Sequence, residues 1–191
     1  MNTASKMLTS VALATFVMTL HAQQPAVGPG TSLESKPPAM NGGPPPGPRR
    51  PIPPAPAPRL ATALSMARKA VAACHGWHVG VTVLDSAGYP KLIYIPDGSD
   101  GFHAYIAFRK ANTALAFGMP SGEVAAATKK DPRLAAKYQA HSADFITFAG
   151  GLPIEAGGKL LGAIGVSGAE PSARDEACAR SALKIMQPGT G

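Results

Sequence analysis

The alternation of apolar and polar positions after residue 59 predicts a helix followed by a β-hairpin. Residues 60–77 carry apolar side chains at a helical spacing, and Gly76 is a typical helix stop. The apolar face predicted for this helix consists of Leu60, Leu64, Ala67, Val71 and Cys74. Residues 78–85 alternate and are rich in β-branched side chains, and residues 89–95 follow a short turn that contains Gly88. These two segments predict antiparallel strands.

The pattern continues with helices and then further strands. Residues 102–118 predict a second helix, with an apolar stripe of Tyr105, Phe108, Asn112, Leu115 and Ala116. Ser121 can cap a short helix after it, whereas residues 129–142 are polar and show no period that assigns an element. Residues 145–168 predict two or three short strands with glycine turns, and residues 171–186 a last helix. Because the first two strands are joined by a tight turn, the order predicts an α+β fold with a mainly antiparallel sheet.

The first 59 residues have a different composition from the rest. Lys6 precedes an apolar run from Met7 to Leu20, which predicts a secretory signal peptide over residues 1–22. The run is shorter than the roughly 20 residues of a membrane span, so no stable span is expected after cleavage. Residues 23–59 hold 13 of the 20 prolines, which predicts a disordered or extended linker. We interpret the linker as a tether rather than a docking segment, and the protein as periplasmic or secreted with a single folded domain over residues 60–191.

The positive charge of the chain does not indicate a nucleic-acid-binding protein. The formal net charge is +7, but residues 60–191 contain 13 basic and 10 acidic residues, a net charge of +3. Aromatic residues make up 6% of the chain, and no basic run alternates with them. The composition therefore argues against nucleic acid as a partner.

Three glycines spaced three residues apart, Gly162, Gly165 and Gly168, raise the possibility of a phosphate-binding loop. A dinucleotide-binding loop has the spacing G-x-G-x-x-G between a strand and a helix N-terminus. Here the spacing is different, and the first two glycines fall inside a predicted strand. Glycine within a strand more often marks a close approach of another backbone. The spacing therefore argues against a nucleotide site.

Several motifs in combination resemble the GlcG/HbpS-like haem-binding family over nearly all of residues 60–186. They are VTVLDSAGYPKLIYIPDG, AFRKANTALAFGMPSGEVA, GGLPI, GGKLLGAIGVSGA and DEACARSAL, in this order. The resemblance implies an α+β sandwich with a five-stranded antiparallel sheet and helices on both sides. It also implies homo-oligomers and haem or a related porphyrin as the ligand.

His103 is the candidate axial ligand of the haem iron, because it follows the DGSDG loop at the start of a helix and neutral imidazole binds haem iron well. Arg109 or Lys110 on the same helix can pair with a haem propionate, and Thr113 falls in the Lys-Ala-x-Thr motif of the family. The alternatives are an exposed histidine without a role and a solvated basic face. His75 and His78 flank Gly76, which argues against a shared metal, and His141 has no evident partner.

Cys74 and Cys178 are the only cysteines of the chain. In an oxidising compartment an even pair favours a disulfide, here between the first and last helices. The alternative is two separately buried thiols, and the sequence leaves both open.

The sequence as a whole favours an exported small-molecule-binding protein that holds haem for sensing, storage or transport. One alternative is an enzyme acting on a small acid or a redox metabolite, although no acid–base pair is recognisable. The other is a non-catalytic accessory or structural oligomer.

Overall fold

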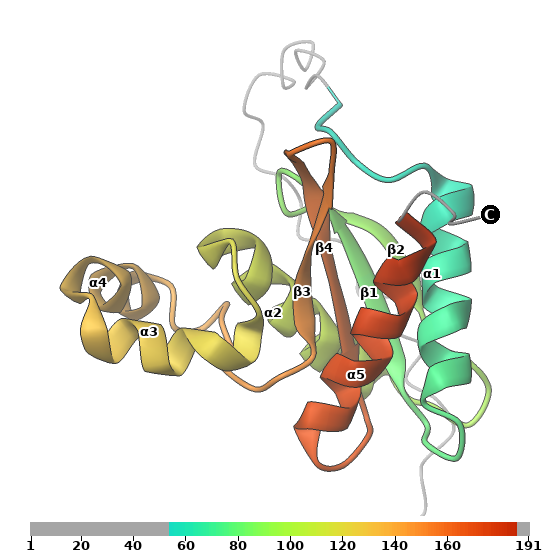
Figure 1. Cartoon of the computed structure of the whole chain (residues 1–191). Coiled ribbons are helices and arrows are strands. Elements are labelled where there is room, and N and C mark those ends of the chain that lie inside the picture. The colour runs from blue at the N-terminus through green and yellow to red at the C-terminus, as the bar shows by residue number, and fades with distance from the viewer. Residues whose placement is uncertain (1–53, 187–191) are drawn as a thin grey trace, which may run out of the picture. The chain divides into compact units, whose positions relative to one another are not determined.

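A four-stranded antiparallel sheet lies at the centre of the protein in the computed structural model, which describes residues 54–186 (Figure 1). The strand order is β2-β1-β4-β3. The strands are β1 (Gly80–Asp85), β2 (Pro90–Tyr94), β3 (Gly151–Ala156) and β4 (Lys159–Ser167). The predicted signal peptide, residues 1–22, and residues 23–53 of the predicted linker lie outside the described residues. Within residues 54–186, no helix has the length and apolar character needed to cross a membrane.

Helices cover both faces of the sheet. Helix α2 packs against one face, while α1 and α5 pack side by side against the other (Figure 1). The helices are α1 (Leu60–Ala73), α2 (Gly101–Phe117), α3 (Val124–Lys130), α4 (Pro132–Ala140) and α5 (Ser172–Leu183), with short 3₁₀ turns η1 (Ser121–Glu123) and η2 (Lys184–Met186). The predicted α+β fold, the first hairpin and the antiparallel sheet are thereby confirmed.

The expectation of five strands is wrong for the described part of the chain. Residues 145–168 contain two strands, β3 and β4, which agrees with the two or three predicted there. Residues 145–148, before β3, pair their backbone with side chains instead of with a neighbouring strand. Arg109 donates to the carbonyl of Phe145 at 2.5 Å, and the Ile146 amide donates to the Thr113 hydroxyl at 2.9 Å. Side chains from α2 therefore take the hydrogen bonds that a sheet ladder would have used.

Helix α2 lies so close to the sheet that glycines are required beneath it. A Cβ atom on Gly165 would lie 1.9 Å from the carbonyl oxygen of Ala107, and one on Gly151 would lie 2.0 Å from that of Lys110. The paired positions Gly151 and Gly165 thus form a surface without side chains. This finding confirms that glycines of the GAIG motif mark a close backbone approach.

The structure confirms part of each predicted helix face, since Cys74 and Leu115 pack in the core, and it corrects the rest. Helix α2 buries small side chains at its contact with the sheet, and Tyr105 of the predicted stripe is exposed. Helix α1 buries Met66 and a row of alanines, and Leu60 is exposed. A bulky stripe does not fit against a glycine surface or between closely packed helices, so the alanine faces turn inward.

The larger core lies between the sheet and the helices α1 and α5. Valine and isoleucine side chains of the strands meet Met66 and the alanines of both helices there. Within this core a disulfide joins Cys74, directly after α1, to Cys178 on α5, with Cα atoms 5.6 Å apart. The sequence had left a disulfide and free thiols open, and the structure shows the disulfide.

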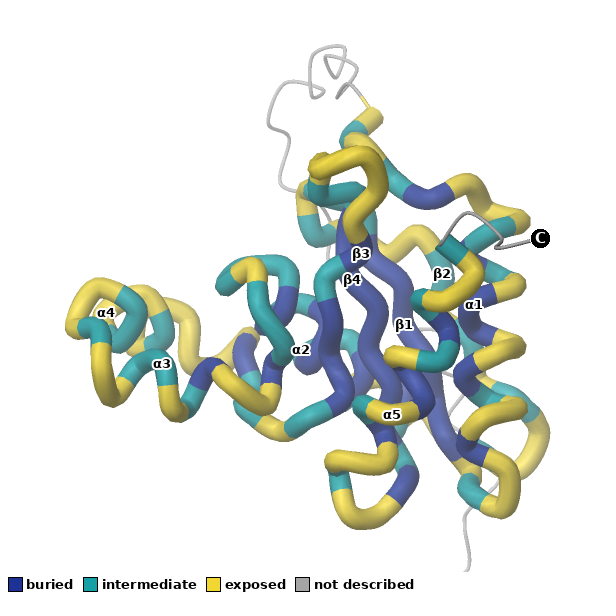
Figure 2. The backbone as a smooth tube through the Cα atoms, viewed as in Figure 1, coloured by how far each residue is buried: buried dark blue, intermediate teal, exposed yellow. Residues whose placement is uncertain are grey.

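Two segments extend the domain beyond the predicted elements. The region 129–142, which we could not assign, contains α4, capped by Asp131 and started by Pro132. Helices α3 and α4 project from the sheet, and no residue of α4 is buried (Figure 2). At the other end, the carbonyl of Pro56 accepts a hydrogen bond from Ser86 and Pro58 is buried, so the last residues of the predicted linker contact the domain.

Candidate functional site

A pocket of about 850 Å³ lies where α2, the loop after β4 and the start of α5 meet. Its volume is in the range of pockets that hold small-molecule ligands. Most of its lining is apolar or aromatic, with a few charged groups. The lining residues are Trp77, Phe102, His103, Ile106, Lys110, Ile146, Phe148, Ser167, Gly168, Ala169, Glu170, Pro171, Ser172 and Asp175.

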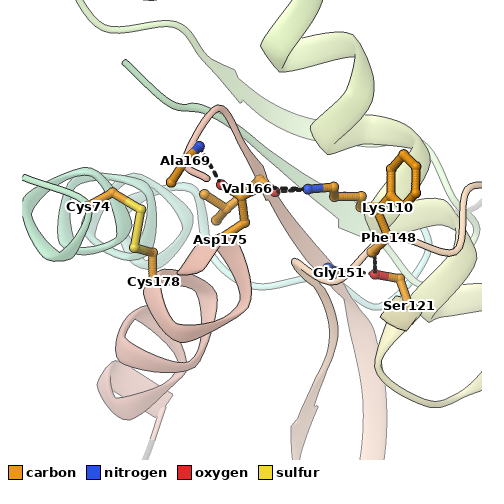
Figure 3. Close-up of polar contacts among 9 residues, drawn as sticks. All are labelled: Cys74, Lys110, Ser121, Phe148, Gly151, Val166, Ala169, Asp175 and Cys178. Atoms are coloured by element: carbon orange, nitrogen blue, oxygen red, sulfur yellow. Dashed lines mark hydrogen bonds and ion pairs between the residues drawn. A yellow bond between two sulfur atoms is a disulfide. The ribbon is translucent and has the colours of Figure 1, made fainter. Parts of the chain in front are cut away.

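Two phenylalanines in the lining remain largely open to solvent. Phe102, at the start of α2, is 65% exposed, and Phe148, in the segment before β3, is 60% exposed. Exposed aromatic side chains around a hollow are typical of a binding surface. Ser121 holds the Phe148 segment in place, because its hydroxyl donates to the Phe148 carbonyl at 2.6 Å and accepts from the Gly151 amide at 2.9 Å (Figure 3).

His103 lies in this lining in the first turn of α2. Asp100 caps the helix by accepting a hydrogen bond from the His103 amide at 2.8 Å. The same carboxylate oxygen lies 3.2 Å from the ring atom Nδ1 of His103. The Nδ1 atom itself is buried, and the two atoms are not aligned as a hydrogen bond. The side chain is 31% exposed. Since Nδ1 faces Asp100, Nε2 is the ring nitrogen left for a ligand.

A buried ion pair forms the polar part of the pocket wall. Nζ of Lys110 donates to Oδ2 of Asp175 at 2.7 Å and to the Val166 carbonyl at 3.2 Å (Figure 3). Oδ1 of Asp175 accepts from the Ala169 amide at 2.8 Å. Both side chains are 2% exposed. The pair therefore ties α2 to α5 and to the loop after β4.

Burial is the main influence on the protonation of this pair. Burial lowers the pKa of Lys110, and the charge of Asp175 offsets this lowering only in part. It raises the pKa of Asp175, against the opposing effects of Lys110 and of backbone amides. Both shifts favour the neutral forms.

Arg109 and Thr113 lie outside the lining of this pocket. Besides Phe145, Arg109 contacts the carbonyl of Ser142 and lies over the ring of Tyr105, with 5.9 Å between Cζ and the ring centroid. Thr113 is buried and donates to the Arg109 carbonyl at 2.8 Å. Both residues brace residues 145–148, the segment that brings Ile146 and Phe148 to the pocket.

The other histidines are separate from the pocket lining. His75 and His78 are exposed after α1, and His141 follows α4, with its Nδ1 atom 4.0 Å from the Asp144 carboxylate. Within residues 54–186, no group of three or more histidine, cysteine, aspartate and glutamate side chains is placed to hold a metal ion.

Sequence reasoning missed several pocket residues. Asp175 was not singled out, because an acidic residue in the first turn of a helix is usually solvated. Trp77 was not predicted as a site residue, yet it lines the pocket and lies under Arg174, with 5.2 Å between the guanidinium carbon and the ring centroid. The buried lysine of the Lys-Ala-x-Thr motif was the available signal, since a buried ammonium needs an acidic partner.

Solved structures with this fold share most of the described chain. HbpS from Streptomyces reticuli, solved as a double mutant, is 31% identical, covers 72% of this chain and 92% of its own, and has a TM-score of 0.60. The Klebsiella pneumoniae protein ORFY is 27% identical over 68% of this chain and 90% of its own, with a TM-score of 0.59. PduOC, solved as a complex with heme, is 23% identical over 70% of this chain and 98% of its own, with a TM-score of 0.60, and shows the shared fold alone.

Among curated proteins, none matches the chain. The family model described as "Haem degrading protein HbpS-like" matches residues 59–184, which is well over half of the chain. The resemblance seen in the sequence motifs is thereby confirmed: the protein belongs to the HbpS-like family.

Proposed function

We propose that the protein binds haem or a related porphyrin in the pocket between α2 and α5, with His103 as the axial ligand. The observation that carries the proposal is the position of His103 in the wall of a large apolar pocket, with Nδ1 directed at Asp100 and Nε2 free. Histidines that bind metals commonly turn their second ring nitrogen toward a carboxylate, which fixes the ring and its tautomer. The residues present therefore fit a haem group.

The walls of the pocket suit a planar apolar ligand. Trp77, Phe102 and Phe148 offer aromatic surface, and Ile106 and Ile146 add aliphatic surface. When bound, haem would supply a redox-active iron whose behaviour depends on the axial ligand and the polarity of the surroundings. The chain's own apolar residues would exclude water from one side of the porphyrin, and the Asp100 carboxylate would lie beside Nδ1 of the imidazole.

The comparisons support this choice of ligand at the level of the family. The family model is described by haem degradation, and one protein with the same fold was solved with heme. We propose that this binding serves sensing, storage or transport.

The structure supports the other predicted site residues, Lys110, Arg109 and Thr113, to different degrees. Lys110 lines the pocket, so a contact with a haem propionate stays a prediction, although its ammonium already pairs with Asp175. For Arg109 and Thr113 we propose an indirect contribution, because their side chains hold the segment that carries Ile146 and Phe148. Direct contact of either residue with haem stays a prediction that the pocket lining does not support.

We further propose that the protein is exported. The Cys74–Cys178 disulfide supports this, because structural disulfides persist mainly in oxidising compartments. Export predicts that the mature protein starts near Gln23, which mass spectrometry of the protein isolated from its native compartment tests directly.

Self-association is also part of the proposal. Large apolar side chains on β2, on the residues directly before and after it, and on α2 are exposed, among them Tyr89, Ile93, Ile95 and Tyr105. Exposed apolar surface of this kind is typical of protein–protein interfaces. Light scattering of the purified protein should give a mass that is a multiple of the protomer, and Ile93→Lys should lower it.

Titration of the purified protein with hemin tests the central proposal. We expect a saturable change in the visible spectrum at a fixed ratio of hemin to protomer. A spectrum that is only the sum of free hemin and protein would contradict the proposal.

A further inference from the structure

We propose that Arg174 binds a carboxylate of the pocket's ligand, so that the site selects a ligand with an apolar body and an acidic edge. The inference rests on the proposed binding of haem or a related porphyrin in this pocket. It assigns the acidic edge of that ligand to the rim of the pocket next to α5, and it identifies a residue that determines specificity for a free carboxylate over a neutral analogue.

The position of Arg174 at the rim follows from two contacts. It lies in the first turn of α5, two residues after Ser172, which lines the pocket. Its guanidinium carbon is 5.2 Å from the ring centroid of Trp77, a residue that lines the same pocket. The guanidinium is therefore held beside the pocket by an aromatic ring that a bound ligand would also contact.

The charge of Arg174 is available to a ligand. The residue is exposed, and among residues 54–186 no carboxylate lies within 4.0 Å of its guanidinium. By contrast, Arg180 on the same helix pairs with Glu176 at 2.6 Å. A guanidinium offers two parallel N–H groups that match a carboxylate, and stacking on an aromatic ring orients it before the ligand arrives.

The interior of the pocket is a less favourable place for an acidic group. Lys110 is the only buried cation in the lining, and its ammonium is 2.7 Å from Asp175. A ligand carboxylate at Lys110 would have to lie beside the Asp175 carboxylate in surroundings of low polarity, where like charges repel strongly.

One acidic side chain at the rim, Glu170, limits where a ligand carboxylate can lie. Glu170 lines the pocket and is exposed, so it disfavours a carboxylate on its side of the loop. The amide groups in the first turn of α5 carry partial positive charge and favour an anion near Arg174. The charges at the rim therefore direct the acidic edge of a ligand toward α5 and its apolar body toward Trp77 and His103.

Hemin and its dimethyl ester, which lacks both free carboxylates, separate this contact from all others. The full chain and its Arg174→Gln and Arg180→Gln variants are titrated with each compound, and unfolding temperatures show that all three proteins are folded. We expect Arg174→Gln to weaken hemin binding about tenfold or more, because it removes a charge-assisted hydrogen bond. The same variant should leave ester binding within about twofold, and Arg180→Gln should change neither.

Each other outcome overturns a defined part of the account. Hemin binding that is unchanged in Arg174→Gln, or weakened equally for hemin and ester, overturns the role of Arg174 and leaves the proposed haem site standing. Failure of the unmodified protein to bind either compound overturns both proposals.

Discussion

The ammonium of Lys110 and the carboxylate of Asp175 lie 2.7 Å apart inside the wall of the pocket, and each side chain is 2% exposed. The pair joins the helix that carries His103 to the helix that carries Arg174. Removal of one partner leaves the other as an unpaired charge or an unsatisfied polar group in the interior. Such a change is far more costly than the net stability that the intact pair contributes.

We therefore expect Lys110→Met and Asp175→Asn each to lower the free energy of unfolding by about 3–5 kcal/mol. The double variant, Lys110→Met with Asp175→Asn, removes both charges and leaves neither one unpaired. Its loss of unfolding free energy should therefore be clearly smaller than the sum of the two single losses. Urea unfolding of the four proteins measures this coupling. Single losses below about 1 kcal/mol, or losses that simply add, would contradict the pairing.

The raised pKa of Asp175 predicts how stability depends on pH. Above its ordinary value of 3.8, the unfolded chain loses the Asp175 proton while the folded protein still holds it. The folded state then binds more protons than the unfolded state, so the contribution of Asp175 is fully present below 3.8 and is lost as the pH rises through the folded pKa. The difference in unfolding free energy between the wild type and Asp175→Asn should therefore fall as the pH rises above 3.8 and through the folded pKa. A difference that grows over this range would show that ion pairing, not burial, controls the carboxyl.

The contact between α2 and the sheet predicts that Gly165 cannot be replaced. Gly165→Ala places a methyl group 1.9 Å from the Ala107 carbonyl oxygen, and a backbone atom cannot move aside as a side chain can. We expect a loss of at least about 1–3 kcal/mol in unfolding free energy. Gly101→Ala is the matched control, since a Cβ atom there meets nothing within 4 Å. Equal stability of the two variants would mean that α2 does not lie as close to β4 as described.

The disulfide predicts a large effect of reduction on stability. It closes a loop of 104 residues between Cys74 and Cys178, and in the loop-entropy account such a crosslink contributes about 4–5 kcal/mol. The double variant Cys74→Ser with Cys178→Ser should therefore unfold at a markedly lower urea concentration than the oxidised protein. The wild-type protein, once its disulfide has been reduced, should unfold at the same low urea concentration as the variant. Two free thiols per chain in the untreated unfolded protein, measured with a thiol reagent, would contradict the crosslink.

The sequence predicted which segments are helices and which are strands more successfully than which faces are buried. The strands β1 and β2 were predicted because β-branched residues flank a tight turn, a local signal. Their alternation did not show that β1 is buried on both faces. The stripe predicted for α2 is wrong at Tyr105, which is exposed, because the close contact with Gly151 and Gly165 admits only small side chains. Phe108 and Leu115 of the same stripe do pack against the smaller core cluster. Only the three-dimensional contact between distant segments shows that small residues must face inward.

The parts of the site that sequence reasoning missed depend on contacts between distant segments. Asp175 lies 65 residues from its partner Lys110, and nothing in its local sequence distinguishes it from a solvated helix-start residue. Helix α4, by contrast, carried a local signal, since Asp131 followed by Pro132 is a typical helix start. The position of His103 in the first turn of a helix was predicted from the sequence, because the preceding loop and the helix start are both local features.

Hemin titration of the wild type, His103→Ala and His141→Ala tests the central claim most directly. His141 is the control because it is exposed after α4 and is not part of the pocket lining. We predict a saturable visible absorption band in the wild type and in His141→Ala. We expect this band to be lost or clearly shifted in His103→Ala, with the protein still folded. A band unchanged in His103→Ala would show that another group holds the iron and would contradict the assignment of this site.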